Sequence, residues 1–221
     1  MLAVTAIPPY WTTWSKSYLA TTEAPVNAMS DHRSLKLPAD KRAHLFRVAS
    51  NEFAAHGFAR ASLNRIIGEV GMSKSSFYHY FDNKSDLFRQ TFSDAVAPIM
   101  KLPQTIDIDA LTSETLWPTV TSAMAQGMQI AQDRPEIITA GRMFYKSRED
   151  PEGAALTGEY LGAISAWTLQ LIRRGQAVGV FRDDLPDDLI IDMLMAMGMT
   201  MDRWILLQWE SFDVARRMQL G

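Results

Sequence analysis

Residues 62–88 read SLNRIIGEVGMSKSSFYHYFDNKSDLF and contain three successive signals for the start of a helix. Ser62, Ser73 and Asn83 each precede a run whose apolar residues have helical spacing, and this is where a helix N-cap is expected. Gly71 ends the first run, because glycine readily adopts the backbone conformation found just after a helix. The stretch therefore predicts two short helices joined by a tight turn, with a longer helix after Asn83.

A further helix is expected immediately before this stretch. Leu45, Val48, Ala49 and Phe53 are spaced so that they share one helical face, and Gly57 is a signal for the end of the helix. Two short helices with a glycine-containing turn, held by a preceding long helix, form a helix-turn-helix. In that motif the second short helix enters the major groove of DNA.

Polar side chains fall on the expected outward face of the second short helix, where they can touch base edges and phosphates. Tyr78 has an alternative role, which is to pack against the first helix, whereas Phe77 and Phe81 are expected in the core. Arg33 and Lys36 lie just before the first helix, either as a basic arm that reaches DNA or as a solvated leader. The predicted contacts on the second short helix are Lys74, Ser75, Ser76, Tyr78 and His79.

Charge is divided unevenly along the chain. The 221 residues contain 22 Lys and Arg against 25 Asp and Glu, a net charge of −3. Residues 33–101 contain 11 basic and 6 acidic residues, a balance of +5, whereas residues 102–221 contain 10 basic and 17 acidic residues, a balance of −7. This asymmetry predicts a module for a polyanion joined to a second module of a different kind.

The composition excludes several other classes of protein. Apolar residues make up 47% of the chain and charged residues 21%, which is typical of a globular protein. There is no cysteine, so disulfides, thiolate zinc sites and cysteine nucleophiles are excluded. The most apolar stretch, Leu189 to Met201, is interrupted by Asp192 and is too short for a membrane-spanning helix. We therefore expect a cytoplasmic protein with no membrane partner.

Residues 1–32 are predicted to be a tail. They contain three prolines and no amphipathic period, although Tyr10, Trp11, Trp14 and Tyr18 are unusual in a solvated segment. We favour a flexible extension, or a translation start at Met29, over an aromatic binding arm.

The C-terminal half is predicted to be helical throughout, with two long helices over residues 152–177 and 187–210. Apolar residues occupy nearly every position of the second helix. A helix that is apolar all round must be buried on more than one side. In a chain of this size, one side faces the domain core and the other is predicted to face a partner subunit.

The run from Gly57 to Phe88 resembles the DNA-binding domain of the TetR family of transcriptional regulators. The Gly57-Phe58 pair, the Ser62 cap, the recognition helix in GMSKSSFYHYF and the NKSDL opening of the next helix carry the resemblance, which extends over residues 40–92. It implies a homodimer on a palindromic operator, with a C-terminal domain that dimerises and binds a small effector. It also implies phosphate contacts from Tyr80, Lys84, and Asn64 or Arg65.

An effector pocket is expected among the middle helices of the C-terminal half. Aromatic and methionine side chains with an occasional charge are typical of a site for a hydrophobic or aromatic small molecule. The candidate lining residues are Trp117, Met124, Met128, Arg142, Phe144, Tyr145, Tyr160 and Trp167.

The run DDLPDD at residues 183–188 matches the DDxxD spacing that binds Mg²⁺ in helical prenyl-transferring enzymes. Pro186 instead favours a loop followed by a helix start, where acidic residues are common. The alternative function is therefore an all-helical lipid- or isoprenoid-processing enzyme, and a regulator gated by protein partners is a further one. No metal or cofactor is expected.

The sequence thus predicts an all-α protein with a tail at 1–32, a three-helix DNA-binding domain at 33–101, and a helical effector-binding and dimerisation domain at 102–221. The predicted function is a ligand-responsive repressor that is not an enzyme.

Overall fold

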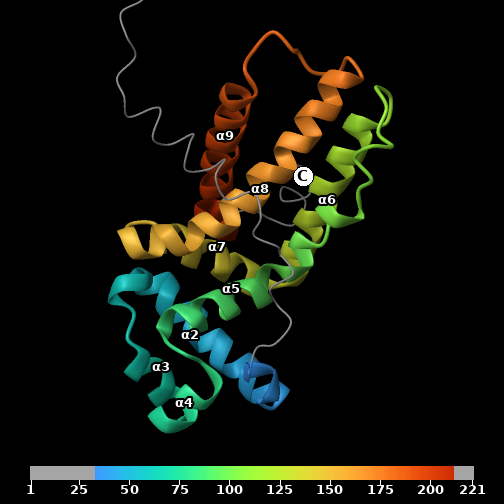
Figure 1. Ribbon diagram of the computed structural model, residues 1–221. Helices are drawn as coiled ribbons and strands as arrows, with labels where there is room; N and C mark the ends of the chain where they lie inside the picture. The colour runs from blue at the N-terminus through green and yellow to red at the C-terminus, as the bar shows by residue number, and fades with distance from the viewer. Residues whose placement is uncertain (1–32, 212–221) are drawn as a thin grey trace, which may run out of the picture.

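A computed structural model describes residues 33–211, so the expected tail at 1–32 and the alternative start at Met29 lie outside the described residues. Within the described range all regular structure is helical, which confirms the all-α prediction (Figure 1). The elements are η1 (Arg33–Lys36), α2 (Ala39–Arg60), α3 (Leu63–Glu69), α4 (Lys74–Tyr80), α5 (Lys84–Met100), η2 (Pro103–Thr105), α6 (Leu116–Asp133), α7 (Pro135–Ser147), α8 (Pro151–Ala177), α9 (Asp187–Gln208) and η3 (Trp209–Ser211).

The three predicted helix starts are confirmed by their capping hydrogen bonds. The side chain of Ser62 accepts a hydrogen bond from the backbone N–H at the third residue of its helix, and Ser73 and Asn83 do the same. Each bond satisfies an N–H group that has no partner within its own helix. Gly71, in the turn between α3 and α4, has a φ of 65°, a conformation that glycine adopts without a steric penalty.

Phenylalanine rings hold the helix-turn-helix together. Phe53 on α2 lies 5.1 Å, centroid to centroid, from Phe88 on α5 in an edge-to-face arrangement. Phe77 on α4 stacks on Phe81 at 5.2 Å, and both are fully buried, as predicted. Burial of such rings supplies most of the favourable free energy of a small core. It therefore fixes α4 against its supporting helices.

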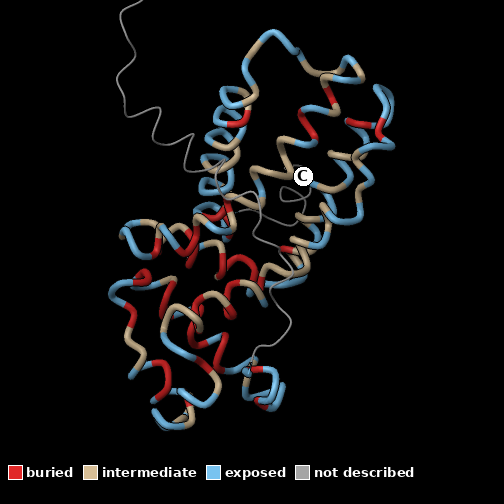
Figure 2. Tube along the Cα trace, in the orientation of Figure 1, coloured by how far each residue is buried: buried red, intermediate tan, exposed pale blue. Residues whose placement is uncertain are grey.

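The same core continues into the C-terminal half. α2 packs more extensively against α7 than against any other element, and buried residues gather where the two halves meet (Figure 2). Phe92 on α5 contacts both Phe144 on α7 and Tyr160 on α8, with centroids 5.7 and 4.5 Å apart. A Cβ atom at Gly57, where φ is 71°, would lie 3.0 Å from the carbonyl oxygen of Lys146, so glycine permits this close approach.

The upper half contains α6, α8 and α9. α8 and α9 run in opposite directions and are joined by a loop at the end distant from α3 and α4 (Figure 1). Little of α9 is buried in this single chain, apart from Ile191 and Leu206 (Figure 2). Among the described helices, none combines the length and apolar character needed to cross a membrane.

Lys84 links the start of α5 to the end of α2. Its Nζ atom donates to the backbone carbonyls of Phe58, Ala59 and Ala61 at 2.8, 3.2 and 3.3 Å. It also lies 4.5 Å from the centroid of the Phe58 ring, on which a cation is attracted to the π face. A positive charge at a helix C-terminus satisfies carbonyls that have no partner within the helix.

We predict that Lys84→Met lowers the free energy of unfolding by about 1.5–3 kcal/mol, because three carbonyls, two of them in partly buried hydrogen bonds, lose a charged donor. Lys74→Met, which removes the same charge from an exposed side chain, should change it by less than about 0.5 kcal/mol. Urea denaturation followed by circular dichroism measures both. Equal stability of the two variants would show that Lys84 does not hold α5 to α2.

Candidate functional site

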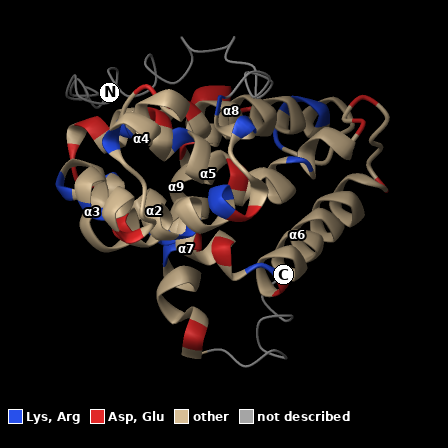
Figure 3. Ribbon diagram, turned by 90° about the horizontal axis from the view of Figure 1, so that it is seen from below, with Lys and Arg blue, Asp and Glu red and all other residues tan. Residues whose placement is uncertain are grey.

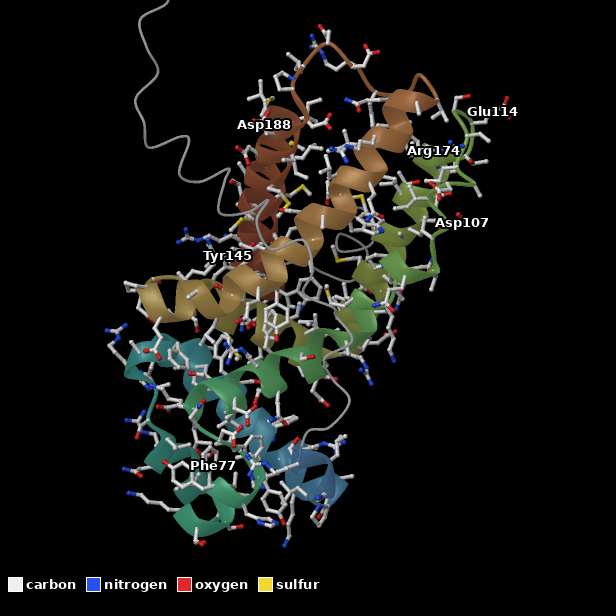
Figure 4. All side chains as sticks on the ribbon, viewed as in Figure 1. Phe77, Asp107, Glu114, Tyr145, Arg174 and Asp188 are labelled. Carbon is white, nitrogen blue, oxygen red and sulfur yellow. The ribbon has the colours of Figure 1, made fainter. Side chains whose placement is uncertain are left out.

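The outward face of α4 is polar and accessible. Lys74, Ser75, Tyr78 and His79 are exposed, whereas Ser76 and Tyr80 are half-buried. The Tyr78 ring packs edge-on against Phe77 yet leaves 53% of the residue exposed. Phe77 lies inside the domain (Figure 4). The face opposite Phe77 is therefore available to a partner.

Arg65 on α3 is engaged within the protein. Its Nη1 atom lies 2.6 and 2.8 Å from the two carboxylate oxygens of Glu52 on α2. Glu52 also accepts the backbone N–H of Ser62 at 2.8 Å. Burial of Glu52 opposes ionisation, but the hydrogen bonds from Arg65 and Ser62 outweigh it and lower the pKa of the carboxyl. Arg65 thus joins α3 to α2, while neighbouring Asn64 is exposed.

Lys84 also points inward, since its Nζ atom binds the carbonyls at the end of α2. The resemblance implies a phosphate contact for Lys84 and for either Asn64 or Arg65, and these contacts stay predictions. The contacts that the structure gives Arg65 and Lys84 are internal and orient α3 and α5. Sequence spacing alone does not reveal these bonds, because their partners lie 13 to 26 residues away along the chain.

The segment before α2 is also attached to the domain. Arg33 forms an ion pair with Asp82 in the turn between α4 and α5, and Ser34 donates to the buried Gln90. η1 therefore lies against the recognition unit, where the paired side chain of Arg33 remains about half exposed.

Further basic residues lie on η1 and on the N-terminal half of α2, close to α4. Figure 3 looks onto this end of the molecule, which includes α3 and α4. Those on α2 are not among the predicted DNA contacts, although they contribute to the +5 balance of residues 33–101. These basic residues are Lys36, Lys41, Arg42 and Arg47. None of them forms an ion pair with another described residue.

A second site lies among α5, α6, α7, α8 and α9, where the structure contains a cavity of about 530 Å³. Four of the eight predicted ligand residues line it, namely Met128, Phe144, Tyr145 and Tyr160. It also has walls that the sequence analysis did not name, including Phe92 and Val96 on α5 and a stripe of α9. The stripe consists of Met195, Met199, Asp202 and Leu206. Their spacing of three or four residues is the sequence signal that they share one face of the helix.

The other four predicted ligand residues do not line this cavity. Arg142 bonds to Glu210 at 2.9 Å and lines a neighbouring groove. Trp167 lines a separate hollow beside residues 103–109. Trp117, whose ring lies 5.4 Å from that of Phe181, and Met124 are each about half exposed. Trp117 and Met124 are on α6, and Trp167 is on α8.

Four side chains with a hydroxyl or carboxyl group interrupt the apolar lining, namely Tyr145, Tyr160, Thr168 and Asp202. Thr168 donates to the carbonyl oxygen of Ile164 at 2.8 Å. Tyr145 donates to Asp202 at 3.1 Å and lies 3.2 Å from the carbonyl oxygen of Met199. Tyr160 donates to the carbonyl oxygen of Arg89 on α5 at 3.1 Å. Loss of hydration raises the pKa of both tyrosines and that of Asp202, although the hydrogen bond from Tyr145 opposes the shift at Asp202. The hydroxyls of Tyr145, Tyr160 and Thr168 thus already donate within the protein.

The acidic run at residues 183–188 does not form the metal site that the enzyme alternative requires. It is the link before α9 and the first turn of that helix, as Pro186 indicated. Arg182 bonds to Asp184 and Arg173 bonds to Asp187, so two of the carboxylates already have partners. Among residues 33–211 no cluster of metal-ligating side chains occurs. The enzyme alternative is not supported.

Comparisons with known proteins agree with the geometry of the helix-turn-helix. Residues 45–91 match the family described as bacterial regulatory proteins, tetR family. An uncharacterised helix-turn-helix transcriptional regulator of Bacillus subtilis, YdgC, is 22% identical over 72% of this chain and 77% of its own length. A helix-turn-helix transcriptional repressor of Streptomyces coelicolor is 27% identical over 73% of this chain and 78% of its own length.

Solved structures share the fold beyond the DNA-binding helices. A TetR family regulator from Chloroflexus aurantiacus superposes with a TM-score of 0.53 at 21% identity, over 83% of this chain and 88% of that one. A transcriptional regulator described as putative, from Pseudomonas aeruginosa, gives 0.55 at 22% identity, over 85% and 90%. Together with the capped helix-turn-helix and its exposed polar face, the family match and the curated relatives indicate a DNA-binding transcriptional regulator whose residues 45–91 match the tetR family.

Proposed function

We propose that this regulator is a cytoplasmic repressor that binds a palindromic operator as a homodimer and leaves it when a small apolar effector fills the cavity. The observation that carries the proposal is the placement of α5. Its N-terminal end packs against α2 of the DNA-binding part through Phe88, and its later residues Phe92 and Val96 line the cavity. One helix therefore contacts both sites, so a ligand that moves α5 changes the population of DNA-binding geometries.

For DNA, we propose that α4 enters the major groove with Lys74, Ser75, Ser76, Tyr78 and His79 toward it. Asn64 and Tyr80 flank this face and would contact phosphates. The unpaired basic side chains of η1 and α2 would contact further phosphates. Arg65 and Lys84 would act by orienting α3 and α5. The division at residue 101 would separate this DNA-binding part from the effector-binding part.

We expect Lys74→Ala and Tyr78→Ala to weaken binding to the regulator's own upstream DNA by about fivefold or more, and Lys74→Ala to reduce the slope of log affinity against log salt by about one. Lys101→Ala is the matched control, since this exposed lysine lies at the distant end of α5. A gel shift at several salt concentrations measures all three. Equal binding by the Lys74 and Lys101 variants would exclude α4 as the reading helix.

For dimerisation, we propose that α8 and α9 pair with their copies in a second chain. α9 exposes a row of large apolar side chains, with Met193 60%, Met197 61% and Leu207 72% exposed. An isolated exposed apolar side chain is ordinary, whereas a continuous row of them is typical of an interface. The row lies opposite the stripe of α9 that lines the cavity.

Met197→Arg should convert the dimer to a monomer, raising the dissociation constant at least about a hundredfold, because a charge would be buried without a partner. Ser122→Arg places the same side chain on the exposed face of α6 and should leave the dimer intact. Sedimentation equilibrium measures the change. A dimeric Met197→Arg protein would contradict this interface.

A further inference from the structure

The walls of the cavity are apolar over most of their extent. Side chains of Phe, Ile, Leu and Met from five helices supply them, and Trp209 lies at one end. Such a lining favours a hydrocarbon chain or ring, because transfer of an apolar body from water to these walls is favourable. The body of the ligand is therefore apolar.

A carboxylate stands in this apolar wall. Asp202 is the sole charged side chain among the described residues that line the cavity. It forms no ion pair with any described residue, and its hydrogen bond comes from the neutral hydroxyl of Tyr145. Its residue remains accessible, so a small molecule in the cavity can reach it.

The basic residues nearest to this point do not face the cavity. Arg148 and Arg203 line the neighbouring groove on the other side of Tyr145. Tyr145 itself is on α7 and lies beside the lower end of α9 (Figure 4). An anionic ligand would thus meet Asp202 without a compensating cation, and a purely apolar one would dehydrate the carboxylate with no new partner.

We infer that the effector is an amphipathic amine, in which an apolar chain or ring carries a positively charged nitrogen that Asp202 binds. The inference rests on the proposed effector cavity and names the chemical class of its ligand. Tyr145 acts as a positioning residue, because its hydroxyl fixes one oxygen of the carboxylate and leaves the other for the ligand.

Three probes with the same ten-carbon chain test the charge preference, namely decylamine, decan-1-ol and decanoate. Binding to the full-length protein is measured by titration calorimetry and by tryptophan fluorescence, since Trp209 lines the cavity. We expect decylamine to bind at least about tenfold more tightly than decan-1-ol, as a charge-assisted hydrogen bond gives, and decanoate to bind most weakly.

Asp202→Asn keeps the shape of the side chain and removes its charge. This substitution should lower the affinity for decylamine about tenfold and leave the affinity for decan-1-ol unchanged. Tyr145→Phe is the matched control, because it removes the hydrogen bond to Asp202 but keeps the carboxylate, and it should retain the preference for the amine. The comparison of probes on the unaltered chain does not depend on whether either variant folds.

Equal affinity for the amine and the alcohol would overturn the inference, and so would an equal loss of both on Asp202→Asn, which would make Asp202 a structural partner of Tyr145. Preference for decanoate would also overturn it. If none of the three probes binds while operator binding persists, the effector cavity fails but the DNA-binding proposal stands. If operator binding is absent while decylamine binds selectively, the DNA-binding proposal fails but the effector cavity and its preference for an amine stand.

Discussion

The aromatic packing around α5 is the interaction on which the rest of the structure depends. Phe88 contacts the rings of α2, and Phe92, one turn further along, contacts rings of α7 and α8. Because interiors are close-packed, a displacement on one side of such a helix is transmitted to the other. The recognition helix, the cavity and the proposed coupling between them all rely on this continuity.

Local chemistry in the sequence was sufficient to predict the helix-turn-helix. The caps at Ser62, Ser73 and Asn83 and the buried ring of Phe77 depend on neighbours within one or two turns of helix. The uneven charge pointed to the same segment, since the net value of −3 averages a basic part and an acidic part. Such features are determined by short-range geometry and are therefore visible without a fold.

Other features depend on contacts between distant parts of the chain. Lys84 and Arg65 have long side chains that can reach either a phosphate or an internal acceptor, and only the tertiary arrangement gives them the internal one. The cavity is lined by residues of five helices, so aromatic character alone cannot separate Phe144 and Tyr160, which line it, from Trp117, which does not. A lone acid on an apolar helix, such as Asp202, has no local signature in the sequence.

The DNA-binding helices and the helices around the cavity share a core, so we expect them to unfold as one cooperative unit. Scanning calorimetry of the full-length protein measures this cooperativity. We expect one unfolding transition in which helix α4 and the helices that line the cavity unfold together. Two transitions, with the DNA-binding part unfolding at a separate temperature from the part after residue 101, would contradict it.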